Sequence, residues 1–207
     1  MNKMVKLSPN DYREMPWKNG LGMTTELAMG HHESIKEGCP FLWRISIVGV
    51  KEDGHFSIFP NIDRNLMLIK GNGITLDGGD VGVGVLFEHL QVYSFPGDID
   101  IKGTLADGPI LDMNLMVDRR FASGEMLGFY VSSPERVMLN SDVNFIHVLE
   151  ESAPVTLDLD GEFTVLKGGE SLHCSKMNSG ATLMPSGGGN DVSSVVCISI
   201  DLKNSPR

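Results

Sequence analysis

The sequence contains 207 residues, a length that suits one large domain or two small fused ones. Hydrophobic residues make up 41% and charged residues 21% of it, which indicates a globular protein and excludes a disordered or fibrous one. Seventeen Lys and Arg against 27 Asp and Glu give a net charge of −10, which argues against a nucleic-acid or anionic-membrane binder because those need basic faces. Small molecules and proteins remain as partners.

Charge is distributed unevenly along the chain. Residues 1–70 carry a net charge of +1, whereas residues 71–207 carry −11. We therefore expect any anion-binding site in the first third of the chain.

Cysteine usage and the N-terminal segment favour a cytoplasmic protein. Cys39, Cys174 and Cys197 are an odd set without CxxC spacing, which supports neither a disulfide framework nor a zinc site. The N-terminal segment lacks the apolar core of a signal peptide, and no run of about 18 apolar residues occurs. We expect no membrane association.

The predicted elements are short strands. Apolar or alternating runs occur at 41–50, 66–69, 81–87, 91–95, 110–117, 144–149, 155–159, 163–166 and 195–202. Turn clusters rich in Gly, Asp and Asn, such as Asp160-Gly161, separate them. No segment has a sustained helical stripe with caps, although residues 8–13 could open a short helical turn. The spacing predicts an all-β sandwich or barrel with few helices.

The two halves follow a similar pattern of strands and glycine-containing turns, once around 66–118 and again around 144–202. We therefore predict two tandem barrels, the first over approximately residues 12–125 and the second over approximately residues 126–207. No Pro/Ser-rich linker separates them, so residues 1–207 are expected to pack as a single compact unit.

The densest polar segment lies at residues 15–27. Trp17, Lys18 and Asn19 combine an aromatic wall, a point charge and an amide beside glycines, where backbone can approach an anionic or amide-bearing ligand closely. The alternative is that Trp17 fills the core and Asn19 belongs to a simple turn.

Further candidates come from strand alternation. Residues 41–47 place Arg44 and Ser46 on the face opposite Trp43, where a buried guanidinium needs a partner such as a bidentate carboxylate. Asp112 and Asn114 likewise share one face of their strand, which is consistent with a lined cavity. The alternative in both cases is a solvated outer face.

The histidine spacing does not support a metal site, because none of the six His forms an HxH or HxxxH pair. Neither a GxSxG elbow nor a Walker-type GxxxxGK[ST] loop is present. We expect no metal and no cofactor.

Several of these motifs in series resemble the HutD/Ves family, part of the cupin superfamily. The resemblance covers roughly residues 12–120 and rests on Pro16-Trp17-Lys18-Asn19-Gly20, Gly22, Thr25-Glu26, Trp43-Arg44-Ile45-Ser46, residues 54–64, Phe95-Pro96-Gly97-Asp98, and residues 112–116 with Arg119-Arg120. The sequence departs from the commoner pattern at Leu21 and at His55-Phe56, which leaves the shape of the pocket mouth open.

The resemblance implies a metal-free, double-barrel cupin (bicupin) fold of jelly-roll type in a bacterial cytoplasmic protein, often a homodimer. It implies a regulatory role in histidine utilisation through binding of a small carboxylated metabolite, such as urocanate or formylglutamate. Ves-type members are instead linked to stress or cold response.

Given this resemblance, we expect the candidate residues to form one ligand site in the first barrel. Lys18 and Arg44 would hold a carboxylate, and Arg64 would contact the ligand or be held by Asp63. The full set is Trp17, Lys18, Asn19, Thr25, Glu26, Arg44, Ser46, Phe59, Asp63, Arg64, Asp98, Asp112 and Asn114.

Three classes of function compete. The first is a binding protein that senses a carboxylated catabolite without turnover. The second is an enzyme in which Asp98, Asp112 or Glu26 acts as general base on the same ligand. The third is an interaction protein, as in the Ves-type role, that binds no small molecule.

Overall fold

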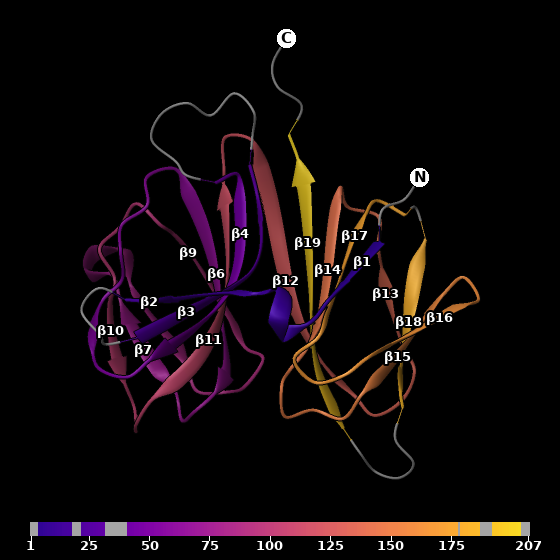
Figure 1. The fold of residues 1–207 in the computed structure, drawn as a ribbon. Helices are drawn as coiled ribbons and strands as arrows, with labels where there is room; N and C mark the ends of the chain where they lie inside the picture. The colour runs from indigo at the N-terminus through magenta and orange to yellow at the C-terminus, as the bar shows by residue number, and fades with distance from the viewer. Residues whose placement is uncertain (1–3, 18–21, 32–40, 178, 187–191, 204–207) are drawn as a thin grey trace. The chain divides into compact units, whose positions relative to one another are not determined.

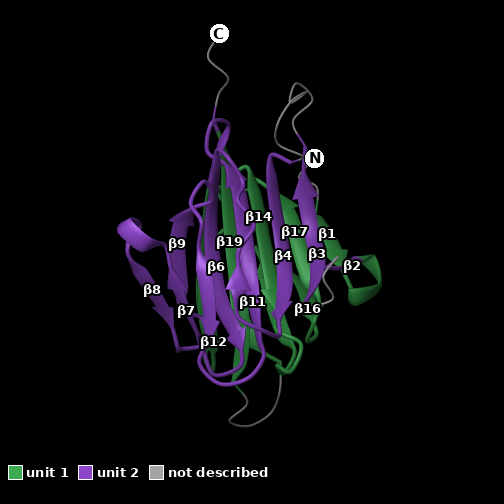
Figure 2. Ribbon diagram, turned by 90° about the vertical axis from the view of Figure 1, so that its left-hand side faces the viewer, with its two compact units in different colours: residues 1–11, 124–202 green, residues 12–123, 203–207 purple. Residues whose placement is uncertain are grey.

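The computed structural model describes residues 4–17, 22–31, 41–177, 179–186 and 192–203. In this part of the chain strands dominate, and the helical segments are two 3₁₀ turns, η1 (Pro9–Asp11) and η2 (Gly79–Val81). No helix among these residues has the length and hydropathy needed to cross a bilayer. The chain divides into two compact units (Figure 2): unit 1 contains residues 1–11 and 124–202, and unit 2 contains residues 12–123 with Lys203.

Unit 2 consists of two antiparallel sheets (Figure 1). The six-stranded sheet has the order β2 (Arg13–Pro16), β3 (Gly22–Gly30), β4 (Trp43–Val50), β11 (Ile110–Asp118), β6 (Ile62–Lys70) and β9 (Val92–Pro96). The four-stranded sheet has the order β5 (Gly54–His55), β10 (Lys102–Leu105), β7 (Ile74–Asp77) and β8 (Val83–Leu86). One apolar core cluster takes side chains from both sheets, among them Leu66 and Ile74.

Unit 1 repeats this plan with a five-stranded and a four-stranded sheet. The first has the order β1 (Met4–Leu7), β17 (Ser171–Ser175), β14 (Val143–Val148), β19 (Ser193–Leu202) and β12 (Ala122–Val131). The second has the order β13 (Glu135–Met138), β18 (Gly180–Pro185), β15 (Val155–Leu159) and β16 (Glu162–Leu166). Its core cluster also draws on both sheets, for example through Ile146 and Leu157.

Local sequence explains the best-defined elements. β15 and β16 are joined by Asp160 and Gly161, both at positive φ (55° and 94°), the backbone that a two-residue hairpin turn requires and that Gly adopts without strain. In β4, alternation puts Arg44, Ser46 and Val48 on one face, and the opposite face carries the fully buried Ile45.

The prediction of an all-β chain with few helices is confirmed, and all nine predicted strands are present. The η1 segment lies within residues 8–13, where a helical turn was expected. Within the described ranges, ten strands were not predicted: β1, β2, β3, β5, β7, β10, β12, β13, β17 and β18. One of them, β12, occupies the region between the two predicted barrels, and residues 1–11 belong to unit 1 because β1 pairs with β17.

Candidate functional site

Unit 2 contains a cavity of about 570 Å³. One wall is formed by the inward face of β3, β4, β6 and β11, and another by residues 52–59, which include β5. The charged side chains of the described lining are Arg44, Arg64, Glu52, Asp53 and His55.

The register of three neighbouring strands aligns the polar groups of this wall in rows. On β11, Met116 lies opposite Arg44 of β4 on one side and opposite Arg64 of β6 on the other. In the next row on the same face, Asn114 pairs with Ser46. Alternation along each strand therefore brings both arginines, the serine and the asparagine to the cavity.

Aromatic rings hold both guanidinium groups. The Arg44 Cζ atom lies 5.1 Å from the ring centroid of Phe41 and 6.0 Å from that of Phe59. The Arg64 Cζ atom lies 5.1 Å from the centroids of both Phe56 and Phe95. Such cation–π contacts favour a partly desolvated guanidinium by about 0.5–2 kcal/mol each. Arg44 Nη2 also donates to Met116 Sδ at 3.3 Å.

A buried polar chain leads from Arg64 through the lining residue Asn114 to Asp112, which is not in the lining. The Arg64 Nη2 atom donates to Asn114 Oδ1 at 2.8 Å, and Asn114 Nδ2 donates to Asp112 Oδ1. Burial raises the pKa of Asp112 to about 7, while the charge of Arg64 and the bond from Asn114 oppose that rise. Burial also lowers the pKa of Arg64 to about 10, so it remains a cation at neutral pH.

Ser46 and Arg64 contribute unused hydrogen-bonding capacity to the lining. Ser46 Oγ and Arg64 Nε are buried and have no hydrogen-bond partner among the described residues. An unsatisfied buried polar group costs about 1–3 kcal/mol, so an occupant that accepts hydrogen bonds here would relieve that cost. Both groups can donate, which favours an anion.

An aromatic side chain, Trp17, lines the cavity beside β3. Trp17 Nε1 donates to Thr24 Oγ1 at 2.9 Å, which fixes the indole against the cavity. Gly22 permits this position, because a Cβ there would lie 2.8 Å from the Trp17 ring and 2.6 Å from Gly49 O. A bulkier residue at 22 would displace either the indole or the strand backbone.

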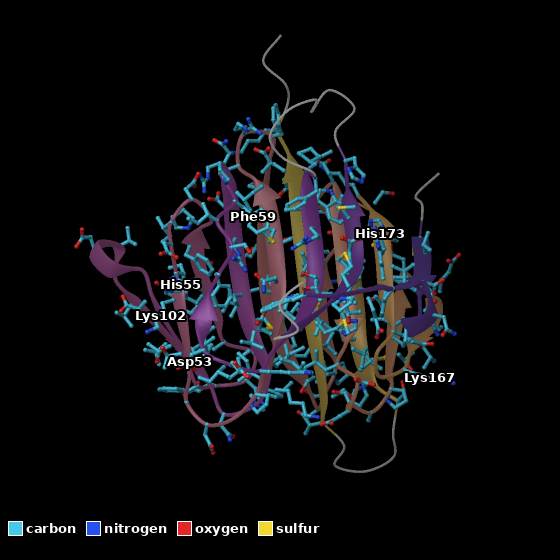
Figure 3. All side chains as sticks on the ribbon, turned by 60° about the vertical axis from the view of Figure 1, so that its left-hand side comes forward. Asp53, His55, Phe59, Lys102, Lys167 and His173 are labelled. Carbon is cyan, nitrogen blue, oxygen red and sulfur yellow. The ribbon has the colours of Figure 1, made fainter. Side chains whose placement is uncertain are left out.

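Polar residues surround the exposed side of the cavity. Asp53 Oδ1 accepts a hydrogen bond from the backbone N–H of Leu105 at 2.8 Å, and His55 Nδ1 lies 2.8 Å from Asp100 Oδ1. Figure 3 labels Asp53 and His55 together with Lys102, which is in register with His55 between β10 and β5. These side chains are exposed, in contrast to the buried arginine of β6.

The structure brings together six of the predicted site residues in the cavity lining: Trp17, Arg44, Ser46, Phe59, Arg64 and Asn114. Asp112 lies behind Asn114 in the buried polar chain. Lys18 and Asn19 lie outside the described residues. Thr25, Glu26, Asp63 and Asp98 are not part of the lining.

The two outlying aspartates contact a different arginine. Asp63 accepts a hydrogen bond from Arg119 Nε at 2.7 Å, and Asp98 is also ion-paired with Arg119. Asp63 and Arg64 are adjacent on a strand, so their side chains point to opposite faces and cannot form the pair that sequence proximity indicated.

The predicted set omitted most of the remaining lining residues, among them Thr24, Phe56 and Met116. Met116 could have been found, because it alternates with Asp112 and Asn114 along the same strand face. Thr24 lies in the polar segment 15–27, but its strand was not predicted, so the face of its side chain could not be assigned.

The donor set of the cavity does not fit a metal ion. Its buried polar groups are the Arg64 guanidinium, the Ser46 and Thr24 hydroxyls and the Asn114 amide, and the half-buried Arg44 adds a second guanidinium. The two guanidiniums would repel a divalent cation. No group of three or more His, Cys, Asp or Glu that could hold a metal occurs in the described ranges.

The sequence pattern of the HutD family matches residues 9–190, which is most of the chain. The chain belongs to the HutD family. Two relatives are each 34% identical to it: Protein Ves of Citrobacter koseri over 113 residues, 53% of the chain, and a 21.2 kDa protein in the hutC 3′ region of Pseudomonas putida over 118 residues, 56% of the chain. The matches span 56% and 59% of those proteins, little more than half of each.

Solved structures extend the likeness to the whole HutD-family chain. A conserved protein of Pseudomonas aeruginosa PAO1 superposes with a TM-score of 0.83 at 25% identity, over 98% of this chain and 100% of the other. HutD from Pseudomonas fluorescens SBW25 gives 0.78 at 23% identity, with the same coverage. Oxalate decarboxylase from Lactobacillus farciminis, a cupin-fold protein, gives 0.63 at 7% identity over 97% of this chain and 87% of its own. The fold is therefore cupin-like.

Proposed function

We propose that this HutD-family protein binds a small carboxylate-bearing metabolite in the cavity of unit 2 and releases it unchanged. The observation that carries the proposal is the pair of arginines that flank Met116 in one row of the cavity wall. Each is held by aromatic rings, and Arg64 Nε and Ser46 Oγ supply buried donors.

A carboxylate suits this arrangement in shape and charge. Its two oxygens match the planar fork of a guanidinium, and hydrogen bonds between charged partners contribute about 1.5–3 kcal/mol each. Trp17 and Phe59 add flat apolar surface to the lining. A planar or short-chain body attached to the carboxylate would therefore bury apolar area against them.

The family supplies the biological setting of the proposal. A relative is named for its place in the hutC 3′ region, and HutD itself has the same fold. We infer a cytoplasmic regulatory role in histidine utilisation, with urocanate or formylglutamate as ligand. We also propose that units 1 and 2 are each a cupin barrel and that the protein forms a homodimer.

Binding without turnover is favoured over catalysis by the position of the carboxylates. Glu26 and Asp98 are not in the lining, and Asn114 lies between Asp112 and Arg64. Asp53, which does line the cavity, accepts a hydrogen bond from Leu105. A general base must lie within hydrogen-bond reach of the proton it removes, which Glu26 and Asp98 do not. Glu52, Asp53 and His55 line the exposed part of the cavity, away from the buried arginine, and recovery of the ligand tests whether any of them acts on it.

Isothermal titration calorimetry tests the proposal, with urocanate, formylglutamate, glutamate and histidine added separately to the purified protein. We expect saturable binding of urocanate or formylglutamate. Arg44→Gln should weaken it by about 10- to 100-fold, the equivalent of one charged hydrogen bond. Arg13→Gln makes the same change at an exposed position of β2 outside the cavity lining and should leave the affinity unchanged.

Chromatographic recovery of the ligand after the titration separates binding from catalysis. Intact ligand supports the binding protein, whereas chemically altered ligand supports the enzyme. Absence of heat with all four compounds, or equal affinity in the Arg44→Gln and Arg13→Gln variants, would overturn the proposal.

A further inference from the structure

Unit 1 contains a cavity of its own, with a volume of about 280 Å³. It is lined by residues of β12, β13, β14 and β19, all from the two sheets of that unit. Its apolar lining includes Leu127, Phe129, Met138 and Ile146. This lining differs from that of unit 2, where two arginines reach the cavity wall.

One polar side chain in this lining is buried with an unused acceptor. Asn144 is 1% exposed, and its Nδ2 atom donates to the backbone carbonyl of Ser141 at 2.8 Å. That bond fixes the orientation of the amide, because the reversed amide would put two acceptor oxygens together. Asn144 Oδ1 is buried and has no hydrogen-bond partner among the described residues. It is the acceptor that remains for an occupant of the cavity.

The surroundings of Asn144 are uncharged. Its register partner on β19 is Ser199, and Cys197 pairs with Ile146 in the next row on the same face. Burial raises the pKa of the Cys197 thiol to about 12, so that group is neutral at physiological pH. The charged lining residues, Glu125 and Arg136, are both exposed.

We propose that unit 1 holds a second, independent ligand site for a small neutral molecule with an apolar body and one N–H or O–H donor. The donor would bond Asn144 Oδ1, and the body would pack against Phe129, Leu127 and Ile146. The volume lies just below the range of pockets for drug-sized ligands, which favours a molecule of one ring or a short chain. The proposed site in unit 1 would therefore prefer a neutral ligand, whereas the proposed site in unit 2 would prefer an anionic one.

The test compares two probes of similar shape that differ in their hydrogen-bond donor. Phenol and toluene are titrated separately into the isotopically labelled full-length protein, and dissociation constants are taken from backbone amide shifts in NMR spectra. Phenol should bind more tightly than toluene and shift residues of β12, β14 and β19. A site with an unpaired buried acceptor should discriminate against toluene, because toluene leaves that acceptor unsatisfied.

Asn144→Leu removes the acceptor at nearly constant volume. This substitution should weaken phenol binding by about 3- to 10-fold, the equivalent of one neutral hydrogen bond. The affinity for toluene should stay unchanged or rise. The matched control is Asn140→Leu, the same replacement at an exposed position of the same lining, which should preserve both affinities. Leu127→Arg changes a half-exposed lining residue, so the fold should tolerate it, and it should weaken both probes.

Two results would overturn the second site. One is the absence of localised shifts with either probe at millimolar concentration, which would leave water as the occupant that satisfies Asn144. The other is equal affinity for phenol and toluene, or unchanged phenol affinity in Asn144→Leu. Carboxylate binding by unit 2 is measured separately, so failure of either site leaves the other interpretable.

Discussion

Replacement of Asp112 by Asn should change how the stability of the protein depends on pH. The side chain is fully buried, and it accepts a hydrogen bond from Asn114 within the chain that leads to Arg64. An Asn at this position keeps nearly the same shape and can still accept that bond, but it cannot ionise. The comparison therefore isolates the titration of one buried carboxyl group.

The magnitude follows from the two pKa values. The unfolded chain loses this proton near the ordinary value of 3.8, whereas the folded protein holds it until about pH 7. Between these values the folded state binds one proton more than the unfolded state, so the free energy of unfolding falls by about 1.4 kcal/mol per pH unit. Across the roughly three pH units the wild type loses about 4 kcal/mol from this group, and the loss is complete above pH 7.

Urea unfolding at a series of pH values from 4 to 8 measures the effect. Both tryptophans, Trp17 and Trp43, lie in unit 2, so their fluorescence reports on the unit that contains Asp112. The free energy of unfolding of Asp112→Asn should differ from that of the wild type by a constant offset of about 1–3 kcal/mol, because the hydrogen bonds are altered. As pH rises towards 7, the variant should in addition become more stable relative to the wild type, because only the wild type loses stability through this group. Parallel curves for the two proteins would show that Asp112 has the same pKa folded and unfolded, and would refute the argument.

Three further predictions concern ligand binding, the cavity wall of unit 2 and the apolar core of unit 1. Ionised Asp112 competes with a carboxylate ligand for Arg64, so calorimetric affinity should fall as pH rises from 6 to 8 in the wild type and stay nearly constant in Asp112→Asn. In Gly22→Val, a Cβ atom 2.8 Å from the Trp17 ring should displace the indole, which a shifted tryptophan emission and weaker carboxylate binding would reveal; unchanged emission would contradict this. Leu157→Ala empties a fully buried position of the unit 1 core and should cost about 2–5 kcal/mol in urea unfolding followed by circular dichroism, and a loss below 1 kcal/mol would mean that the core closes around the gap.

Hydrophobic periodicity identified the strands that have a clear alternating apolar pattern in their own sequence. β4 and β11 are apolar on at least one face over their whole length, so alternation alone indicated them and the faces of Arg44 and Asn114. β3 and β12 were missed because they mix polar residues and glycines, and their conformation depends on pairing with neighbouring strands. β1 pairs with β17, more than 160 residues away, and no local pattern contains that information.

The site was predictable as a set of residue types but not as a geometry. Arg44 and Arg64 were both singled out, yet their placement on either side of Met116 depends on the registers of two strand pairs. Asp98 was included as part of the motif Phe95-Pro96-Gly97-Asp98, whereas its carboxylate binds Arg119 and the backbone N–H of Asn61. Partner choice among charged groups is decided in three dimensions, since residues on opposite faces of one strand do not meet.

The charges around the cavity of unit 2 indicate why an anion should complete it. Arg44 and Arg64 introduce two positive charges, and the charge of Arg44 contributes to the lowered pKa of Arg64. Asp112 offsets part of this at neutral pH, because burial leaves it only partly ionised. A ligand with one carboxylate would restore the balance and satisfy Arg64 Nε and Ser46 Oγ at once. Folding retains a buried cation, Arg64, beside the half-buried cation Arg44 at a cost in stability, and on the proposed function that cost is recovered when the ligand binds.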